Sequence, residues 1–292
     1  SAVPSESVKH EEVATRLRQD IVRGKYPPGS RLPTSRRLTR QLHISSATLN
    51  DAFHLLQRER FIRTQGRRGT FVHDAPPFLT RYAVVSSAPR NSGNRFLETA
   101  MLQATRITRA RKRRLTVYPD LLSPRRARQY DELADKIRHH RVAGVLICES
   151  HRRFSGTPLV ETPELPCMAI DSQPAAQPHV GTILHDIRAM LVQMIQQYQA
   201  AGRRRPAILA TNEFLLAHGR ILRDLLQESE LSVPDYLFQS VALKHPDSAG
   251  NIVRLMLHPD LAARPDGLIV LDDNLLPVVD AVLGEMGVDV PG

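Results

Sequence analysis

The sequence predicts an α/β protein with an N-terminal winged helix-turn-helix followed by a two-lobed, doubly wound parallel-sheet domain. Three observations lead to this prediction. Two helical patterns separated by a short turn, and then a basic hairpin, occupy the first 75 residues. After a double proline, short apolar runs alternate with helical stretches, as in βαβ units. This alternation starts again near residue 173, which indicates a second lobe.

The stretch Gly24–Val72 organises the first 75 residues. An amphipathic helix is expected over Glu11–Arg23, because its apolar residues recur one turn apart. Within the stretch, a short helical pattern ends near His43, and Ser45 or Ser46 can cap the next helix. That next helix buries one face through residues at i, i+3, i+4 and i+7, namely Leu49, Ala52, Phe53 and Leu56.

A β-hairpin is expected directly after this helix, with strands at Phe61–Gln65 and Thr70–Val72. The turn between them, Gly66-Arg67-Arg68-Gly69, is basic. Two helices joined by a short turn and followed by such a hairpin are typical of a winged helix-turn-helix, whose second helix enters the major groove of DNA. The outer face of the second helix carries small or polar residues, which fits contact with base edges.

The strings Gly29–Leu38 (GSRLPTSRRL) and Gly66–Val72 (GRRGTFV) resemble the DNA-binding domain of GntR-type transcription regulators, in order and spacing, over about residues 9–73. The resemblance implies DNA contacts from the LPxxR segment, the start of the recognition helix and the wing. That family usually has arginine where this chain has Ser46 and Asn50, so the bases that are read cannot be taken from relatives. The expected DNA-binding residues are Arg31, Arg36, Ser45, Ser46, Ala47, Thr48, Asn50, Gln65, Gly66, Arg67 and Arg68.

The expected domains are a DNA-binding domain over residues 1–75, a stiff proline-containing linker over 76–80 and an α/β domain over 81–292. Its first lobe covers about residues 81–172 and its second lobe about 173–292. The run Val142–Cys148 is apolar throughout, as a strand covered on both faces must be. Strands are expected at Tyr82–Ser86, Leu115–Tyr118, Val142–Cys148, Pro166–Ile170, Ala207–Ala210, Phe238–Leu243 and Leu268–Leu271.

Several short matches within residues 81–292 resemble the effector domains of LacI/GalR-type repressors, which are similar to periplasmic sugar-binding proteins. They include Arg141–Ile147 (RVAGVLI), Pro166–Asp171 (PCMAID) and Pro265–Asp273 (PDGLIVLDD). The resemblance implies a periplasmic-binding-protein-like fold with a sugar-like ligand between the lobes. Arginine and carboxylate side chains can bind such a ligand by hydrogen bonds to its hydroxyl groups. The matching positions give candidate ligand contacts at Asn94, Arg95, Phe96, Asp186, Arg220 and Asp273.

That family continues beyond the position that corresponds to Gly292. We therefore expect either a truncated product or an effector domain that lacks sheet strands. In the second case apolar residues next to the missing strand would be exposed.

The net charge of +10 is unevenly distributed along the chain. Residues 1–78 hold 14 Lys and Arg against 7 Asp and Glu, residues 79–141 hold 15 against 5, and residues 142–292 hold 11 against 18. This basic N-terminal part and acidic C-terminal part are explained if a polyanion contacts residues 1–141. The cluster Arg106–Arg114 either faces DNA or is the solvated end of a helix.

Other classes of protein are disfavoured. Cys148 and Cys167 lie in apolar runs, which indicates buried thiols in a reducing cytoplasm and disfavours a disulfide or a metal site. No apolar run approaches the ~20 residues of a membrane span, and the N-terminus lacks a secretion signal. Phosphate-binding, zinc-protease and nucleophile-elbow motifs are absent, so neither catalysis nor a cofactor is expected.

The sequence therefore predicts a ligand-responsive transcription regulator in the cytoplasm, a repressor that binds a pseudo-palindromic operator as a homodimer. Its partners would be double-stranded DNA and a sugar or related metabolite. One alternative is a constitutive DNA-binding protein whose α/β domain only dimerises. A second alternative, an enzyme, predicts turnover of the bound ligand.

Overall fold

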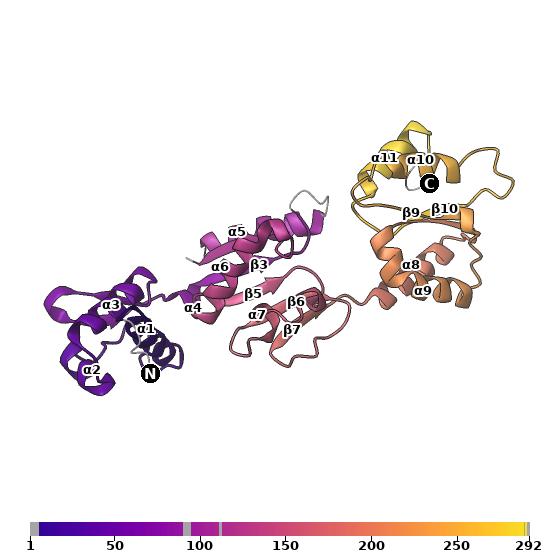
Figure 1. Cartoon of the computed structure of the whole chain (residues 1–292). Helices are drawn as coiled ribbons and strands as arrows, with labels where there is room; N and C mark the ends of the chain where they lie inside the picture. Colours follow the sequence, from indigo (N-terminus) through magenta and orange to yellow (C-terminus); the bar gives the residue numbers. More distant parts are fainter. Residues whose placement is uncertain (1–5, 90–94, 111–112, 289, 291–292) are drawn as a thin grey trace. The chain divides into compact units, whose positions relative to one another are not determined.

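A computed structural model of the chain describes residues 6–89, 95–110, 113–288 and 290 (Figure 1). The chain divides into two compact units. Unit 1 contains Ser1–Ala88 and Met101–Leu184, and unit 2 contains Pro89–Ala100 and His185–Gly292. Helix α5 (Arg95–Ala110) therefore begins among the residues of unit 2 and ends among those of unit 1.

Unit 1 begins with the predicted winged helix-turn-helix, here called the head (residues 6–75). Its core is a single apolar cluster in which Leu17, Leu49, Leu56 and Phe61 are fully buried. The two strands of the wing pair antiparallel, with Ile62 opposite Val72. The elements of the head are α1 (Glu6–Val22), α2 (Ser35–Leu42), α3 (Ser46–Arg58), β1 (Ile62–Thr64), the 3-10 turn η1 (Gly66–Arg68) and β2 (Thr70–Val72).

The segment expected to be a linker forms a one-turn helix, α4 (Pro77–Thr80). Pro77 occupies its first position, where the missing N–H has no intrahelical partner to lose. Phe78 stacks on Phe61 of the head, with ring centroids 6.1 Å apart and planes 14° from parallel. The linker therefore packs against the head through an aromatic contact.

The rest of unit 1 is a five-stranded parallel sheet in the order β4-β3-β5-β6-β7. Alternate strand residues, such as Val85 and Ile147, pack with Leu133 and Phe154 in one buried cluster. The elements are β3 (Arg81–Val85), β4 (Arg114–Tyr118), η2 (Pro124–Arg126), α6 (Ala127–Arg138), β5 (Gly144–Ile147), η3 (His151–Phe154), α7 (Pro158–Glu161), β6 (Cys167–Asp171) and β7 (Val180–Leu184).

Strand β7 extends this sheet beyond residue 172, where the first lobe was expected to end. It pairs with β6 along its whole length, from Val180 opposite Cys167 to Leu184 opposite Asp171. Ile183 and Leu184 are 51% and 52% exposed, and Gly181 interrupts the apolar pattern. A strand with so little burial carries a weak sequence signal, because the alternation of apolar and polar residues along a strand reflects which of its faces is buried.

Unit 2 is a three-layer α/β unit, as predicted, with a parallel sheet in the order β10-β8-β9. Figure 1 shows α8 and α9 on one side of this sheet and α10 and α11 on the other. All six residues of β8 are buried, because Ile208 faces one apolar cluster and Leu209 the other. The elements are α8 (Ile187–Ala200), β8 (Pro206–Thr211), α9 (Asn212–Glu228), η4 (Asp235–Leu237), β9 (Phe238–Val241), α10 (Ser248–Met256), β10 (Gly267–Val270) and α11 (Leu276–Glu285).

A carboxylate before β10 ties three segments of unit 2 together. Asp266 accepts hydrogen bonds from the hydroxyl of Tyr198 and from the backbone N–H groups of Arg204 (2.8 Å) and Arg205 (2.9 Å). Burial alone would raise the pKa of Asp266, but these donors hold that pKa below its usual value.

We expect Asp266→Asn to lower the free energy of unfolding by about 1–3 kcal/mol at pH 7, because charge-assisted hydrogen bonds are lost. A carboxyl whose pKa is depressed in the folded state stabilises it above the unfolded pKa and loses this contribution as pH falls through the folded pKa. The difference between the two proteins should therefore shrink below about pH 4. Urea unfolding followed by circular dichroism measures it, with the exposed Asp260→Asn as control. A difference that stays constant down to pH 3 would contradict the assigned charge effect.

Candidate functional site

The first turn of α3 is fixed by a pair of hydroxyl groups. Ser45 Oγ accepts a hydrogen bond from the backbone N–H of Thr48 (3.0 Å) and lies 2.8 Å from Thr48 Oγ1. Thr48 is only 6% exposed, so its side chain contributes to the cap of α3 and little to the solvent-facing surface of the helix. Ser46, Ala47 and Asn50 are exposed and are the predicted residues that α3 presents to solvent.

We expect Ser45→Ala to destabilise the protein by about 1 kcal/mol, because the capping acceptor at the start of α3 is lost. Ser46→Ala is the matched control, since Ser46 is exposed and the structure assigns its side chain no capping bond. Chemical denaturation of both variants measures the difference. Equal stabilities for the two variants would show that Ser45 does not act as the cap.

Three predicted cations gather around the wing. Arg31 forms a β-bridge with Phe71, and its Nε lies 2.9 Å from where a Cβ on Gly69 would stand. Gly69 has φ +105°, which allows the turn to close beside the Arg31 side chain. Arg67 and Arg68 lie within the wing turn and are exposed.

The remaining predicted positions also lie in the head. Gln65 donates its backbone N–H to Gly69 O (2.9 Å) and so closes the turn that contains Gly66. Arg36 lies on α2 and is exposed. Within the part of the chain that the structure describes, the guanidinium groups of Arg36, Arg67 and Arg68 have no ion-pair partner. They are available to phosphate oxygens.

In unit 2, three segments meet near the carboxyl end of β10. Arg95 donates its backbone N–H to Asn274 Oδ1 (2.8 Å), and the ring of Phe96 meets His185 edge-on at 6.4 Å. Phe96 is 45% exposed. Asp273 beside Asn274 is exposed as well. The predicted Asn94 lies outside the described residues.

The other two predicted ligand contacts have different surroundings. Asp186 is exposed and caps α8 by accepting the backbone N–H of Ala189 (2.9 Å). Arg220 lies midway along α9 and lines a groove with Arg223 and Phe238. No ion pair or hydrogen bond joins Arg220 to another predicted ligand residue in the described part of the chain.

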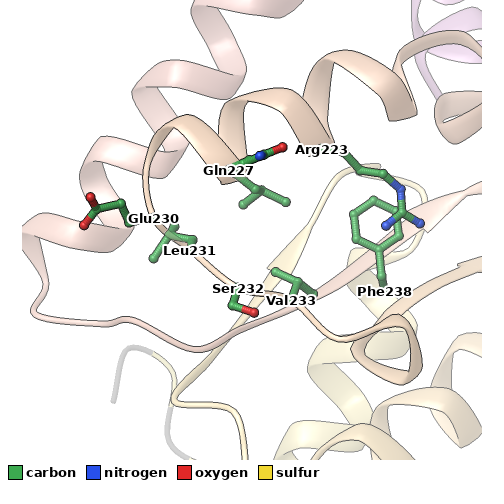
Figure 2. A pocket seen from close by; sticks show the side chains of 8 residues that line it. Arg223, Gln227, Glu230, Leu231, Ser232, Val233 and Phe238 are labelled. Carbon is green, nitrogen blue, oxygen red and sulfur yellow. The ribbon is translucent and has the colours of Figure 1, made fainter.

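A neighbouring groove of about 400 Å³ is formed by the end of α9 and the segment that leads to β9 (Figure 2). Its dominant feature is the guanidinium of Arg223, which lies 4.0 Å from the centre of the Phe238 ring. This cation–π contact already occupies the aromatic face. The structure thus joins Arg95 to Asn274, the neighbour of Asp273, but places Arg220 in a different groove.

Unit 1 has a polar cluster where its strands end. Glu149, after β5, accepts hydrogen bonds from the backbone N–H and hydroxyl of Ser87, the latter at 2.6 Å, and lies 3.3 Å from Arg153 Nε. His151 Nδ1 lies 2.8 Å from Asp171 Oδ2, with both side chains almost fully buried.

Burial alone would raise the pKa of Asp171, but hydrogen bonds from Ser150 and from the backbone, together with His151, lower it. This carboxyl is therefore ionised at neutral pH. The cluster lies at the carboxyl edge of a parallel sheet, as Asp273 does in unit 2. Open α/β sheets bind ligands at this edge.

Cys148 and Cys167 are free and buried, as predicted, and burial raises the pKa of each thiol to about 11. Among the described residues, no group of three or more metal-ligating side chains occurs. Nor does any described helix have the length and apolar character needed to cross a membrane.

Residues 9–72 match the gntR family of bacterial regulatory proteins. This segment is a gntR-type helix-turn-helix domain. The chain is 33% identical over 95 residues to the galactonate operon transcriptional repressor of Escherichia coli, and 34% identical over 67 residues to the HTH-type transcriptional regulator Rv1152 of Mycobacterium tuberculosis. These matches cover 32% and 23% of this chain, and only 34% and 55% of those two relatives.

Solved structures extend the comparison beyond the gntR-type head. The Escherichia coli transcriptional repressor ascG matches with a TM-score of 0.56 at 16% identity, over 73% of this chain and 75% of that one. A LacI family regulator from Lactobacillus casei with bound glucose matches with a TM-score of 0.55 at 12% identity, over 73% and 78%. At such identities the likeness concerns the fold alone, and it confirms the predicted α/β fold of the part that follows the head.

Four polar residues near strand ends were absent from the sequence-based prediction, although the gntR-type head was predicted in detail. Glu149 and His151 follow β5, and Asp171 ends β6. Asp272 follows β10 and accepts hydrogen bonds from Thr211 Oγ1 (2.9 Å) and from the backbone N–H of Asn274 (2.9 Å). Their shared sequence signal is a polar residue at the end of an apolar run or a few positions after it.

Proposed function

We propose that the chain is a ligand-responsive transcription regulator, in which the gntR-type head binds DNA and the LacI-type α/β part binds a small molecule. The observation that carries the proposal is the combination of the two parts in one chain. The head exposes the start of α3 and several arginines. Both parallel sheets carry charged side chains at their carboxyl edges, where ligands bind in this class of fold.

On DNA, Arg36, Arg67 and Arg68 would contact phosphates and fix the position of the head. Ser46, Ala47 and Asn50 would face base edges from the first turns of α3. The amide of Asn50 has the donor and acceptor that pair with N7 and N6 of adenine. A homodimer would present two such helices to the half-sites of a pseudo-palindromic operator.

For the small molecule we propose a sugar or sugar acid, with Asp273, Arg95 and Phe96 among its contacts. Carboxylates accept hydrogen bonds from neighbouring hydroxyl groups, and an exposed aromatic ring packs against the apolar face of a sugar. The glucose bound to the Lactobacillus casei regulator and the galactonate operon controlled by the Escherichia coli repressor support this class. Such a repressor would act in the cytoplasm and would need no catalysis.

Two measurements on the full chain test the proposal. Selection from random duplex DNA should return a site made of two related half-sites, and calorimetry against a panel of sugars and sugar acids should find a ligand. A selected site without any ligand would favour a constitutive DNA-binding protein. Conversion of the bound ligand, seen by product analysis, would favour an enzyme.

A further inference from the structure

The C-terminal end of the recognition helix carries a buried carboxylate. Glu59 caps α3 and has a side chain that is only 9% exposed. Its Oε2 accepts hydrogen bonds from Arg18 Nη2 (2.6 Å) and Nε (3.2 Å). Arg18 is 2% exposed and also lies over the ring of Phe61. One carboxylate oxygen therefore holds α1 and α3 together within the head.

The other oxygen of Glu59 faces outside the head. Glu59 Oε1 lies 3.6 Å from Nη1 of Arg141, which stands between α6 and β5 of the five-stranded sheet. The other end of the same guanidinium pairs with Asp135 on α6. Arg18, Glu59, Arg141 and Asp135 thus alternate in charge, and we call this chain of contacts the Arg141 bridge.

Other groups around the Arg141 bridge are mainly cationic. Burial lowers the pKa of Arg81, and the neighbouring Arg114, Arg60 and Arg141 lower it further while Glu59 opposes them. Because these arginines repel one another, the contact between head and sheet depends on Glu59 and Asp135. His139 Nδ1, 3.0 Å from Asp135 Oδ1, adds a further contact on the side of α6.

An aromatic contact supports the same junction. Phe78 of α4, the short helix that leads into β3, stacks on Phe61 of the head. Arg141 is 21% exposed and Asp135 is 41% exposed, so water reaches one side of the bridge. A junction that relies on an aromatic stack and partly solvated charges can open without unfolding either partner.

The bridge leaves the DNA-reading end of α3 uncovered. Ser46 stands about 20 Å from Glu59 along a helix of this length, and Ser46, Ala47 and Asn50 are exposed. From this geometry we infer that the Arg141 bridge holds the recognition helix in a fixed orientation on the sheet of unit 1, in the state that binds DNA. Loss of the bridge frees the head to reorient and weakens operator binding.

This inference rests on the proposed function for its effect on DNA, but its structural part can be tested alone. In the full chain, spin labels are placed at Gln41→Cys on α2 and Arg128→Cys on α6, both exposed positions. Cys148 and Cys167 are buried with raised thiol pKa values, so labels react with the introduced cysteines. Pulsed electron resonance then gives the distribution of distances between head and sheet.

Arg141→Gln should broaden that distribution, whereas Arg138→Gln should leave it unchanged. Arg138→Gln is the matched control, because it also removes a cation near Asp135. The Arg138 side chain is 67% exposed, and its Nη2 lies 4.0 Å from Asp135 Oδ1. Arg141→Lys keeps the charge but cannot span both carboxylates, so an intermediate width is expected. An unchanged distribution in Arg141→Gln overturns the bridge, whatever the protein does on DNA.

The second arm measures affinity for the DNA site that the unmutated chain selects. Arg141→Gln without the labelling substitutions should bind that site about fivefold more weakly or worse, and Arg138→Gln should bind it like the unmutated chain. A broadened distribution with unchanged affinity overturns the role of the bridge in DNA binding. If the unmutated chain selects no site, the proposed function fails, and the distance measurement still decides the bridge.

Discussion

Glu59→Ala is expected to lower the free energy of unfolding by about 3–5 kcal/mol, which is a large part of the stability of a small domain. The substitution leaves the guanidinium of Arg18, only 2% exposed, without its carboxylate partner. An unpaired buried charge costs far more than a lost surface contact. Urea denaturation followed by circular dichroism measures the effect, with the exposed Glu11→Ala on α1 as control.

The double variant Arg18→Met, Glu59→Leu sharpens this test. Replacing both partners of a buried ion pair by apolar residues often restores stability, so the double variant should be more stable than Glu59→Ala. A loss below about 1 kcal/mol in Glu59→Ala, the size of a surface pair, would contradict the buried pair. If the single and the double variant lost equal free energy of unfolding, the destabilisation would come from packing and not from an unpaired charge.

We expect a second large effect from the exposed arginines of the head. Arg36→Ala and Arg67→Ala should each weaken binding to the selected operator by about tenfold, and each should reduce the magnitude of the salt slope by about 1. The physical reason is that each guanidinium releases condensed counterions when it meets a phosphate. Fluorescence anisotropy at several salt concentrations measures both quantities.

Arg204→Gln is the matched control for these two variants, because Arg204 is exposed but belongs to unit 2. It should change neither the operator affinity nor the salt slope. If Arg36→Ala and Arg67→Ala also left both unchanged, the assignment of the DNA interface would fail.

The head followed from the sequence because its signals are local. Leu49, Ala52, Phe53 and Leu56 recur at helical spacing, and all four are buried in one core. Ser45 or Ser46 was expected as a cap, and Ser45 accepts the backbone N–H of Thr48. The sequence did not indicate that Thr48 would turn its hydroxyl toward Ser45, because a small polar residue on the first turn of a helix fits either role.

Longer-range features carried no comparable signal. Glu59 and Arg141 are 82 positions apart, and nothing in either local pattern indicates that they meet. Strand β7 is half-exposed, so its apolar residues alternate weakly. Arg220 was placed at a ligand site by its position in a family pattern, yet it lines a groove with Phe238 instead of meeting Asp273. Side-chain direction on a long helix depends on packing that sequence spacing alone does not specify.

We expect a small molecule bound by the α/β part to change how the head binds DNA. The most direct measurement is the affinity of the full chain for its selected operator, with and without a saturating amount of the sugar or sugar acid found by calorimetry. We expect a change of about fivefold or more, which corresponds to a coupling free energy of about 1 kcal/mol or above. An operator affinity that is the same with and without the bound ligand would contradict it.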